Sequence, residues 1–155
     1  MKRVAILGRA ASGKSTLAAS LSNLTGLPVI ELDRYFWRAD LVPVEPDRWM
    51  SAQQKLIAEN ETWIMDGDLG PLDTLEPRLR AADTVIVLDF SLLRCGWRAV
   101  RRSPERADFW RWVLDYRRHL RRTMESIAAA AANADVHVFR NPAALRRFVA
   151  GVRSQ

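Results

Sequence analysis

The sequence feature that most constrains the fold is a segment of small residues between an apolar run and a helical pattern. Residues 8–15 are Gly-Arg-Ala-Ala-Ser-Gly-Lys-Ser, which fits the phosphate-binding pattern G-x-x-x-x-G-K-[ST]. The glycines at both ends allow the backbone to curl so that successive N–H groups face phosphate oxygens. The helix predicted to begin near Lys14 adds the positive end of its dipole. We therefore predict a strand, a phosphate-binding loop and a helix in this order.

The residue types of this loop predict which groups bind a nucleotide. Lys14 is expected to neutralise the β- and γ-phosphates, and the Ser15 hydroxyl is expected to bind Mg²⁺. The alternative is a chance match in a glycine turn, which occurs in about 1 in 200 chains of this length. The position between a strand and a helix favours the functional interpretation. The residues expected to hold the nucleotide here are Gly8, Ala10, Ala11, Ser12, Gly13, Lys14, Ser15 and Thr16.

Apolar and helical patterns alternate along the rest of the chain. Strands are predicted at residues 2–7, 28–32, 62–66, 83–90 and 135–139. Helices are predicted at residues 14–24, 47–60, 91–102, 105–132 and 142–152. Asp47 is expected to cap the second helix. The strands are continuously apolar, which is typical of a parallel sheet covered on both faces. We predict an α/β fold in which residues 1–155 form one domain, because this length suits one core.

Charge and cysteine content limit the partners. The chain has a net charge of +6, with 10 basic and 13 acidic side chains in residues 1–93 and 14 basic and 5 acidic ones in residues 94–155. An arginine-rich part suits a polyanion, which would be nucleotide phosphates, nucleic acid or an anionic membrane. The apolar runs are too short to cross a membrane, so we expect no membrane partner. The single cysteine, Cys95, fits a reducing compartment, and we expect a cytoplasmic protein.

Three further segments resemble one family of proteins. They are residues 31–37 (Glu-Leu-Asp-Arg-Tyr-Phe-Trp), 63–67 (Trp-Ile-Met-Asp-Gly) and 104–108 (Pro-Glu-Arg-Ala-Asp). With the phosphate loop, they resemble adenylate-kinase-like P-loop proteins over nearly the whole chain, specifically the DNA topology modulation (FlaR-type) proteins. The resemblance implies a three-layer sandwich with a five-stranded parallel sheet in the order 2-3-1-4-5. It also implies ATP or GTP with Mg²⁺, and transfer of the γ-phosphate to a small acceptor, a nucleoside or nucleotide before any other metabolite.

Residues after the second predicted strand are candidates for acceptor binding. Asp33 is expected to orient the acceptor hydroxyl or to accept its proton. The alternatives for Asp33 are a helix cap or an ion pair with Arg34. Arg34 and Arg38 suit an acceptor phosphate, should the acceptor be a nucleotide. Trp37 and its aromatic neighbours are expected to line the acceptor pocket, and a plain core cluster is the alternative.

Carboxylates at two strand ends are candidates for Mg²⁺ binding. Asp66 ends the third predicted strand and Asp89 the fourth, on the ligand side of a parallel sheet. The resemblance implies that Asp66, followed by Gly67, holds Mg²⁺ through water, so Asp66 is preferred and Asp89 is second. We place Asp66 and Gly67 in the acceptor site as well. The family usually has Asp-Gly-Asn-Tyr here, whereas this chain has Asp68 and Leu69 at the last two positions.

Arginines later in the chain are candidates for phosphate binding. Arg98 and Arg102 follow Asp89 by nine and thirteen residues, spacings at which adenylate-kinase-like enzymes place phosphate-clamping arginines. They share a helix face and would neutralise charge on the transferred group, and a solvated arginine face is the alternative. Relatives insert a basic lid after this helix, whereas here the lid is short or absent. Arg140 follows the fifth predicted strand and is expected near the nucleotide base, with a simple helix start as the alternative.

Two other functions fit part of the pattern. A nucleotide-dependent DNA-binding regulator would suit the basic second part, but the sequence has no helix-turn-helix or base-reading element, so nucleic acid is not the favoured partner. A degenerate nucleotide-binding protein with little transfer activity would suit the short lid. His119 has no partner that its spacing identifies, and the sequence has no zinc pattern.

Overall fold

The computed structural model describes residues 1–38, 40, 42–91, 95 and 107–152, with side chains of the last range described from residue 119 onward. The strands are β1 (Arg3–Gly8), β2 (Val29–Glu31), β3 (Trp63–Asp66), β4 (Thr84–Leu88) and β5 (Asp135–Phe139). The helices are α1 (Lys14–Thr25), α2 (Asp33–Phe36), α3 (Pro46–Glu59), the 3₁₀ helix η1 (Gly70–Leu72), α4 (Glu76–Ala81), α6 (Ala107–Ala130) and α7 (Pro142–Val152). Among the described residues, no helix is both long and apolar enough to cross a membrane.

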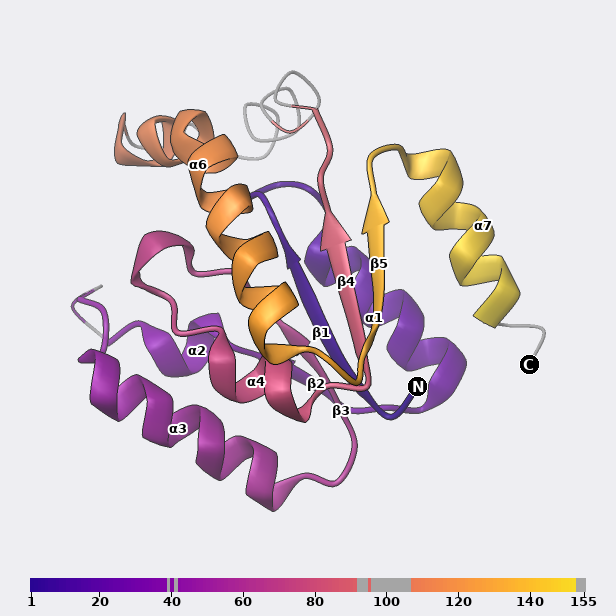
Figure 1. Ribbon diagram of the computed structural model, residues 1–155, viewed down its shortest axis with the longest axis horizontal. Helices are drawn as coiled ribbons and strands as arrows, with labels where there is room; N and C mark the ends of the chain where they lie inside the picture. Colours follow the sequence, from indigo (N-terminus) through magenta and orange to yellow (C-terminus); the bar gives the residue numbers. More distant parts are fainter. Residues whose placement is uncertain (39, 41, 92–94, 96–106, 153–155) are drawn as a thin grey trace.

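The five strands form one parallel sheet in the order β2-β3-β1-β4-β5, as predicted (Figure 1). The register pairs Asp66 with both Ile6 and Glu31, and it pairs Gly8 with Leu88. The carboxyl ends of the three strands on the β2 side of the sheet therefore lie at one edge. In open parallel sheets this edge is where ligands bind. The register thus brings the phosphate loop, Asp66 and the start of α2 together.

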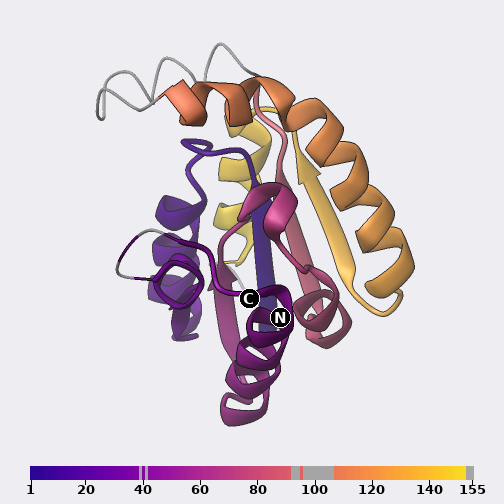
Figure 2. The same cartoon turned by 90° about the vertical axis from the view of Figure 1, so that its left-hand side faces the viewer.

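Helices cover both faces of the sheet, so β3 and β4 are buried along their whole length and β1 is buried after Arg3. One core cluster contains Ala5, Leu7, Met65 and side chains from α2, α3, α4 and α6. The other contains Val4 and Ile6 with side chains from α1 and α7. The two views show these helix groups on opposite sides of the sheet (Figures 1 and 2). Alternate residues of one apolar strand thus contribute to two cores, which explains the continuous apolar pattern.

Most predicted elements are present, with boundaries shifted by at most two residues, and two helical features differ. The helix α3 begins at Pro46, with Glu45 as its N-cap residue, so the prediction that Asp47 caps it is wrong. A proline in the first turn loses no hydrogen bond and has a suitable φ, so the helix begins one residue earlier. The short helices α2, η1 and α4 were not predicted, because none spans enough turns to give a clear periodicity. The predicted helix 91–102 lies outside the described residues except Ser91 and Cys95, and Cys95 is buried.

The start of β4 is tied to the start of β1 by one carboxylate. Asp83 Oδ2 accepts hydrogen bonds from the backbone N–H groups of Lys2 and Arg3 at 2.6 and 3.0 Å, and its Oδ1 accepts one from the Thr84 hydroxyl at 2.7 Å. Burial opposes ionisation of Asp83, but these hydrogen bonds outweigh it and lower the pKa of Asp83 below its ordinary value. The ionised form is therefore the one that holds the two strands in register.

We expect Asp83→Ala to lower the free energy of unfolding by about 1 kcal/mol at pH 7, because it removes these hydrogen bonds. A carboxyl whose pKa is lowered on folding stabilises the protein above its unfolded pKa and loses this effect as the pH falls through its folded pKa. The difference between variant and wild type, measured by urea unfolding, should therefore shrink below about pH 3.8. Asp135→Ala, at an exposed carboxylate of β5, is the control. A difference independent of pH would contradict this account.

Candidate nucleotide-binding site

The phosphate loop leaves β1 through backbone conformations that favour glycine. Gly8 has φ +143° and Gly13 has φ +101°, and Ala11 between them has φ +57°. A Cβ on Gly8 would lie 2.7 Å from the carbonyl oxygen of Leu88, so no other residue fits there without moving β4. A left-handed alanine costs about 1 kcal/mol, and such strain is typical of binding loops. Alternation of positive and negative φ turns successive N–H groups to one side, which is the geometry of an anion nest.

The helix α1 begins directly after this loop. Gly13 is its N-cap residue, and no side chain of the described residues caps its N-terminus. The first N–H groups of the helix are therefore available to an anion. Lys14 Nζ donates hydrogen bonds to the carbonyl oxygens of Gly8 and Arg9 at 2.8 and 3.2 Å. The structure thus places the ammonium group of Lys14 over the loop, and Ser15 and Thr16 are exposed beside it.

Asp66 is a buried carboxylate with one free oxygen. It ends β3 beside the Ser15 hydroxyl, and within the described part of the chain its Oδ1 has no hydrogen-bond partner. Burial raises the pKa of Asp66, Ser15 and Lys14 oppose this, and the charges of Asp33 and Glu31 add to it. A buried, unpaired carboxylate oxygen is costly unless a ligand completes it.

The donor set at Ser15 and Asp66 fits Mg²⁺. A hydroxyl and a carboxylate are hard oxygen donors, and Mg²⁺ usually takes only one or two protein ligands, with water and phosphate oxygens completing the shell. In the described residues, no three His, Cys, Asp or Glu side chains gather as a metal cluster, which agrees with such a sparse site. The predicted pair of Ser15 and Asp66 is therefore brought together at this edge of the sheet.

The second predicted metal ligand has a different environment. Asp89 Oδ2 lies 3.5 Å from Arg140 Nε, an ion pair between the ends of β4 and β5. The same pair occupies Arg140, which was predicted near the nucleotide base. The carboxylate that contacts Ser15 is Asp66.

The acceptor candidates follow β2 as predicted, with one change of partner. Asp33 is the first residue of α2, and its Oδ1 accepts a hydrogen bond from Trp37 Nε1 at 3.3 Å. Arg34 pairs with Glu31 through two hydrogen bonds of 2.7 and 3.2 Å, so the alternative pairing of Asp33 with Arg34 is absent. Arg38 Nε lies 3.9 Å from Asp40 Oδ1. Asp33 is thus the carboxylate of this segment that remains without an arginine among the described residues.

The aromatic residues of this segment divide between core and surface. Phe36 is 1% exposed and packs edge-on against Trp37 and Trp49. Tyr35 is 49% and Trp37 is 39% exposed. The core alternative therefore holds for Phe36, whereas Tyr35 and Trp37 remain available to a ligand. The predicted phosphate clamp, Arg98 and Arg102, lies outside the described residues.

Two further residues at this edge had no role in the sequence analysis. Asp68 Oδ2 accepts the N–H of Gly8 at 3.1 Å, and Asp68 Oδ1 lies 2.6 Å from His119 Nε2. Burial opposes ionisation of Asp68, but the hydrogen bonds from His119 and Gly8 and the charge of Lys14 outweigh it, so the pKa of Asp68 is lowered. The sequence signals were the departure from Asp-Gly-Asn-Tyr and the isolated histidine, but no spacing rule joins residues 68 and 119.

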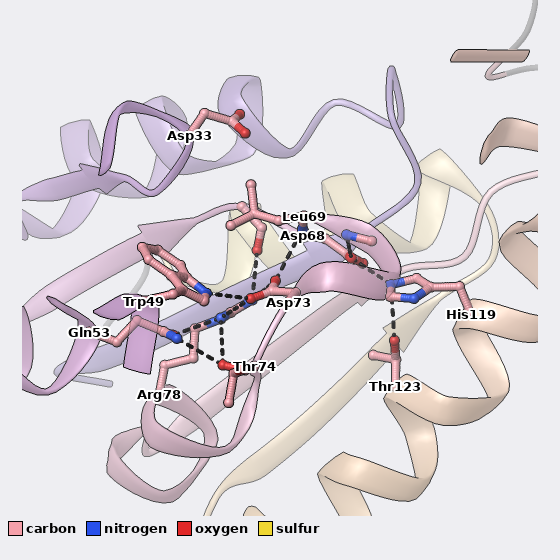
Figure 3. A network of polar contacts seen from close by, with 12 residues as sticks. Asp33, Trp49, Gln53, Asp68, Leu69, Asp73, Thr74, Arg78, His119 and Thr123 are labelled. Atoms are coloured by element: carbon pink, nitrogen blue, oxygen red, sulfur yellow. Dashed lines mark hydrogen bonds and ion pairs between the residues drawn. The ribbon is translucent and has the colours of Figure 1, made fainter. Parts of the chain in front are cut away.

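The loop after β3 is held by a buried guanidinium (Figure 3). Arg78 donates to Asp73 through both of its terminal nitrogens, to Gln53 Oε1 at 2.7 Å and to the carbonyl oxygen of Gly67 at 3.3 Å. Trp49 Nε1 also donates to Asp73 Oδ1, at 3.0 Å. Neither Arg78 nor Asp73 exposes any of its side chain. This network holds the backbone carbonyl of Gly67 in place. Asp33 lies apart from the network (Figure 3).

Comparison with known proteins supports the fold. No family model and no curated protein sequence matches the chain. Among solved structures, a sugar kinase from Janibacter sp. matches with a TM-score of 0.61 and 18% identity, covering 99% of this chain and 91% of that one. The deoxyadenosine kinase from M. mycoides with bound dATP matches with a TM-score of 0.59 and 13% identity, covering both chains completely (100%). The shikimate kinase from Acinetobacter baumannii in complex with shikimate matches with a TM-score of 0.60 and 13% identity, covering 98% and 90%.

These similarities define the class of fold. The chain has the fold of P-loop kinases, with the parallel order 2-3-1-4-5 that these structures share. The broad resemblance to P-loop kinase folds is therefore confirmed, and the narrower resemblance to DNA topology modulation proteins stays a prediction. At this level of identity the comparison concerns the fold alone, so the chemistry has to be argued from the residues of this chain.

We expect Asp66→Asn to raise the stability of the nucleotide-free protein by about 1 kcal/mol at pH 7, because it removes a buried, incompletely paired charge. The same variant should weaken Mg²⁺-dependent nucleotide binding by about tenfold, because an amide is a poorer ligand for Mg²⁺. Thermal unfolding with and without nucleotide, in Mg²⁺ and in EDTA, measures both effects. Glu61→Gln, at an exposed carboxylate, should change neither. A variant that loses stability and keeps nucleotide affinity would show that Asp66 is structural.

Proposed function

We propose that this protein is a phosphotransferase that binds Mg·ATP or Mg·GTP and transfers the γ-phosphate to a hydroxyl group of a small acceptor. The observation that supports this best is the grouping at one sheet edge of an anion nest, the Lys14 ammonium and the Ser15–Asp66 pair. A nest and a lysine alone would suit any phosphate. The buried Asp66 carboxylate, whose Oδ1 is unpaired among the described residues, would provide a ligand for the metal ion that phosphoryl transfer requires.

The donor nucleotide would be held by the phosphate loop. Its backbone N–H groups and the start of α1 would surround the phosphates, and Lys14 would leave the carbonyls of Gly8 and Arg9 to contact the β- and γ-phosphates. Ser15 and Asp66 would hold Mg²⁺, which when bound neutralises charge on the phosphate oxygens. Other residues proposed for the donor site are Ala10, Ala11, Ser12, Gly13 and Thr16 in the loop, Arg140 near the base, and Arg98 and Arg102 on the transferred group.

The acceptor would bind beside Asp33 and Trp37. Asp33 would accept the proton of the acceptor hydroxyl, and the hydroxyl oxygen of the acceptor would form a new bond to the γ-phosphorus. The bond between the γ-phosphorus and the β–γ bridging oxygen would break at the same time. The products are the phosphorylated acceptor and the nucleoside diphosphate. The Trp37 indole, which already donates to Asp33 Oδ1, would hold the carboxylate in place. Gly67, which directly follows Asp66, completes the proposed acceptor side.

Charge on this side favours a neutral acceptor. Arg34 and Arg38, the arginines next to Asp33 in the sequence, already pair with Glu31 and Asp40. A nucleoside therefore fits the described residues better than a nucleotide, and another neutral hydroxyl compound is the second choice. The fold neighbours include kinases named for a sugar, gluconate, deoxyadenosine and shikimate, so this fold accommodates several hydroxyl acceptors. A thermal-shift screen of nucleosides, nucleotides and sugars with a Mg·ATP analogue present tests the assignment directly.

We expect Lys14→Ala to weaken nucleotide binding by at least about tenfold, because it deletes a charge-assisted contact to phosphate. Isothermal titration calorimetry with Mg·ATP and Mg·GTP measures the dissociation constants. Lys55→Ala removes an exposed lysine on α3 and should leave them unchanged. Equal affinity of wild type and Lys14→Ala would refute the nucleotide site.

We expect Asp33→Asn to retain nucleotide affinity while the rate of phosphoryl transfer falls by about 10²-fold or more, the usual effect of removing a proton acceptor. The measurement is release of nucleoside diphosphate in the presence of the acceptor found by the screen. Loss of Mg·ATP binding in this variant would place Asp33 in the metal site instead and contradict its proposed role.

A further inference from the structure

Asp68 lies just beyond the point where the pairing between β1 and β3 ends and the phosphate loop begins. The pairing of β1 with β3 ends at Ile6 and Asp66, whereas the pairing of β1 with β4 continues to Gly8 and Leu88. On the β3 side, the N–H of Gly8 therefore lies beyond the last strand pair. Asp68 Oδ2 accepts this N–H at 3.1 Å, in place of a strand carbonyl. One carboxylate thus fixes the residue at which the strand becomes the loop.

Asp68 is in turn held by α6. Its Oδ1 lies 2.6 Å from His119 Nε2, so the two side chains share a hydrogen bond. Thr123, one turn later on α6, lies with its hydroxyl 3.4 Å from the same nitrogen. The side chain of Asp68 is 0% exposed and that of His119 is 9% exposed (Figure 3). A buried charge is tolerated only when it is fully paired, so removing the histidine would disturb the carboxylate that holds Gly8.

We infer that Asp68 and His119 are positioning residues that hold the phosphate loop in its binding conformation and couple it to the placement of α6. This inference rests on the proposed function, because it concerns nucleotide phosphates as the ligand of the loop. The coupling is reciprocal: a loop held by α6 binds phosphate more tightly, and a bound phosphate holds α6 in place. The pair joins three elements that are far apart in sequence, namely β1, the loop after β3, and α6.

The test compares four single variants at a temperature where each is folded. Asp68→Ala removes the contact to Gly8, and His119→Phe removes the contacts of the imidazole to Asp68 and Thr123 but leaves the contact between Asp68 and Gly8 in place. His119→Gln keeps an N–H donor and serves as the conservative rescue. Asp83→Ala weakens the fold at the start of β1 and β4, the end of the sheet away from the phosphate loop, so it controls for loss of stability alone. Calorimetry with the non-hydrolysable Mg·AMP-PNP gives the affinity, and the ¹H–¹⁵N resonance of the Gly8 amide reports its hydrogen bond.

We expect Asp68→Ala to weaken analogue binding by about tenfold and His119→Phe by several-fold, with His119→Gln within about twofold of wild type. The double variant that combines Asp68→Ala with His119→Phe should bind the analogue no worse than Asp68→Ala alone, because His119 acts through Asp68. Asp83→Ala should lower stability and leave the affinity within about twofold. The Gly8 amide resonance should move in both Asp68→Ala and His119→Phe.

Two results would overturn the inference. The first is unchanged affinity in His119→Phe and Asp68→Ala, and the second is a Gly8 resonance that does not move in His119→Phe. If Asp68→Ala does not fold, Asp68→Asn replaces it, since its amide oxygen still accepts from Gly8 while the charge toward His119 is lost. A wild-type protein that does not bind the analogue would refute the proposed function itself. The Gly8 resonance in His119→Phe would then decide whether the positional coupling exists.

Discussion

The buried guanidinium of Arg78 is the interaction on which the geometry of the site depends. Its side chain is fully buried, and a buried guanidinium is stable only when neighbouring groups accept its hydrogen bonds and balance its charge. Asp73 supplies the counter-charge, and the carbonyl oxygen of Gly67 accepts a further hydrogen bond. Asp73 also accepts the N–H of Leu69. Both ends of the short segment between β3 and η1 are therefore fixed from one side, and this segment contains Asp68.

Two buried carboxylates two residues apart consequently have opposite environments. Burial raises the pKa of Asp66, whose Oδ1 has no hydrogen-bond partner in the described part of the chain. Burial acts on Asp68 as well, but His119 and Gly8 complete its hydrogen bonds and lower its pKa. A satisfied carboxylate stabilises the fold, whereas an unsatisfied one beside a loop for phosphate gains most from a cation. The difference favours a structural role for Asp68 and supports the proposal that Asp66 binds a ligand.

The fold and the phosphate loop could be predicted from the sequence because their signals are local. An apolar strand, a glycine-rich turn and a helix occur within 25 residues, and continuously apolar strands between helical patterns indicate a parallel sheet covered on both faces. The pair of Asp68 and His119 is separated by 51 residues, and the Arg78–Gln53 contact by 25, so no periodicity joins them. The helix α4 has six residues, and one of its two buried residues is Arg78. A charged residue on the buried face breaks the apolar periodicity from which a helix is predicted.

On the proposed acceptor side, the ion pair that Arg34 forms changes which acceptor these residues favour. In the sequence, Arg34 next to Asp33 suggested an acceptor phosphate, but Arg34 also lies three residues after Glu31, the last residue of β2, and that pair forms. The charges of Glu31 and Asp33 both act on Asp66, raising its pKa. An anionic acceptor would add a further negative charge to this group of carboxylates, at a cost that grows as water leaves the site. A neutral hydroxyl compound brings no such cost, and the exposed rings of Tyr35 and Trp37 offer it apolar contact.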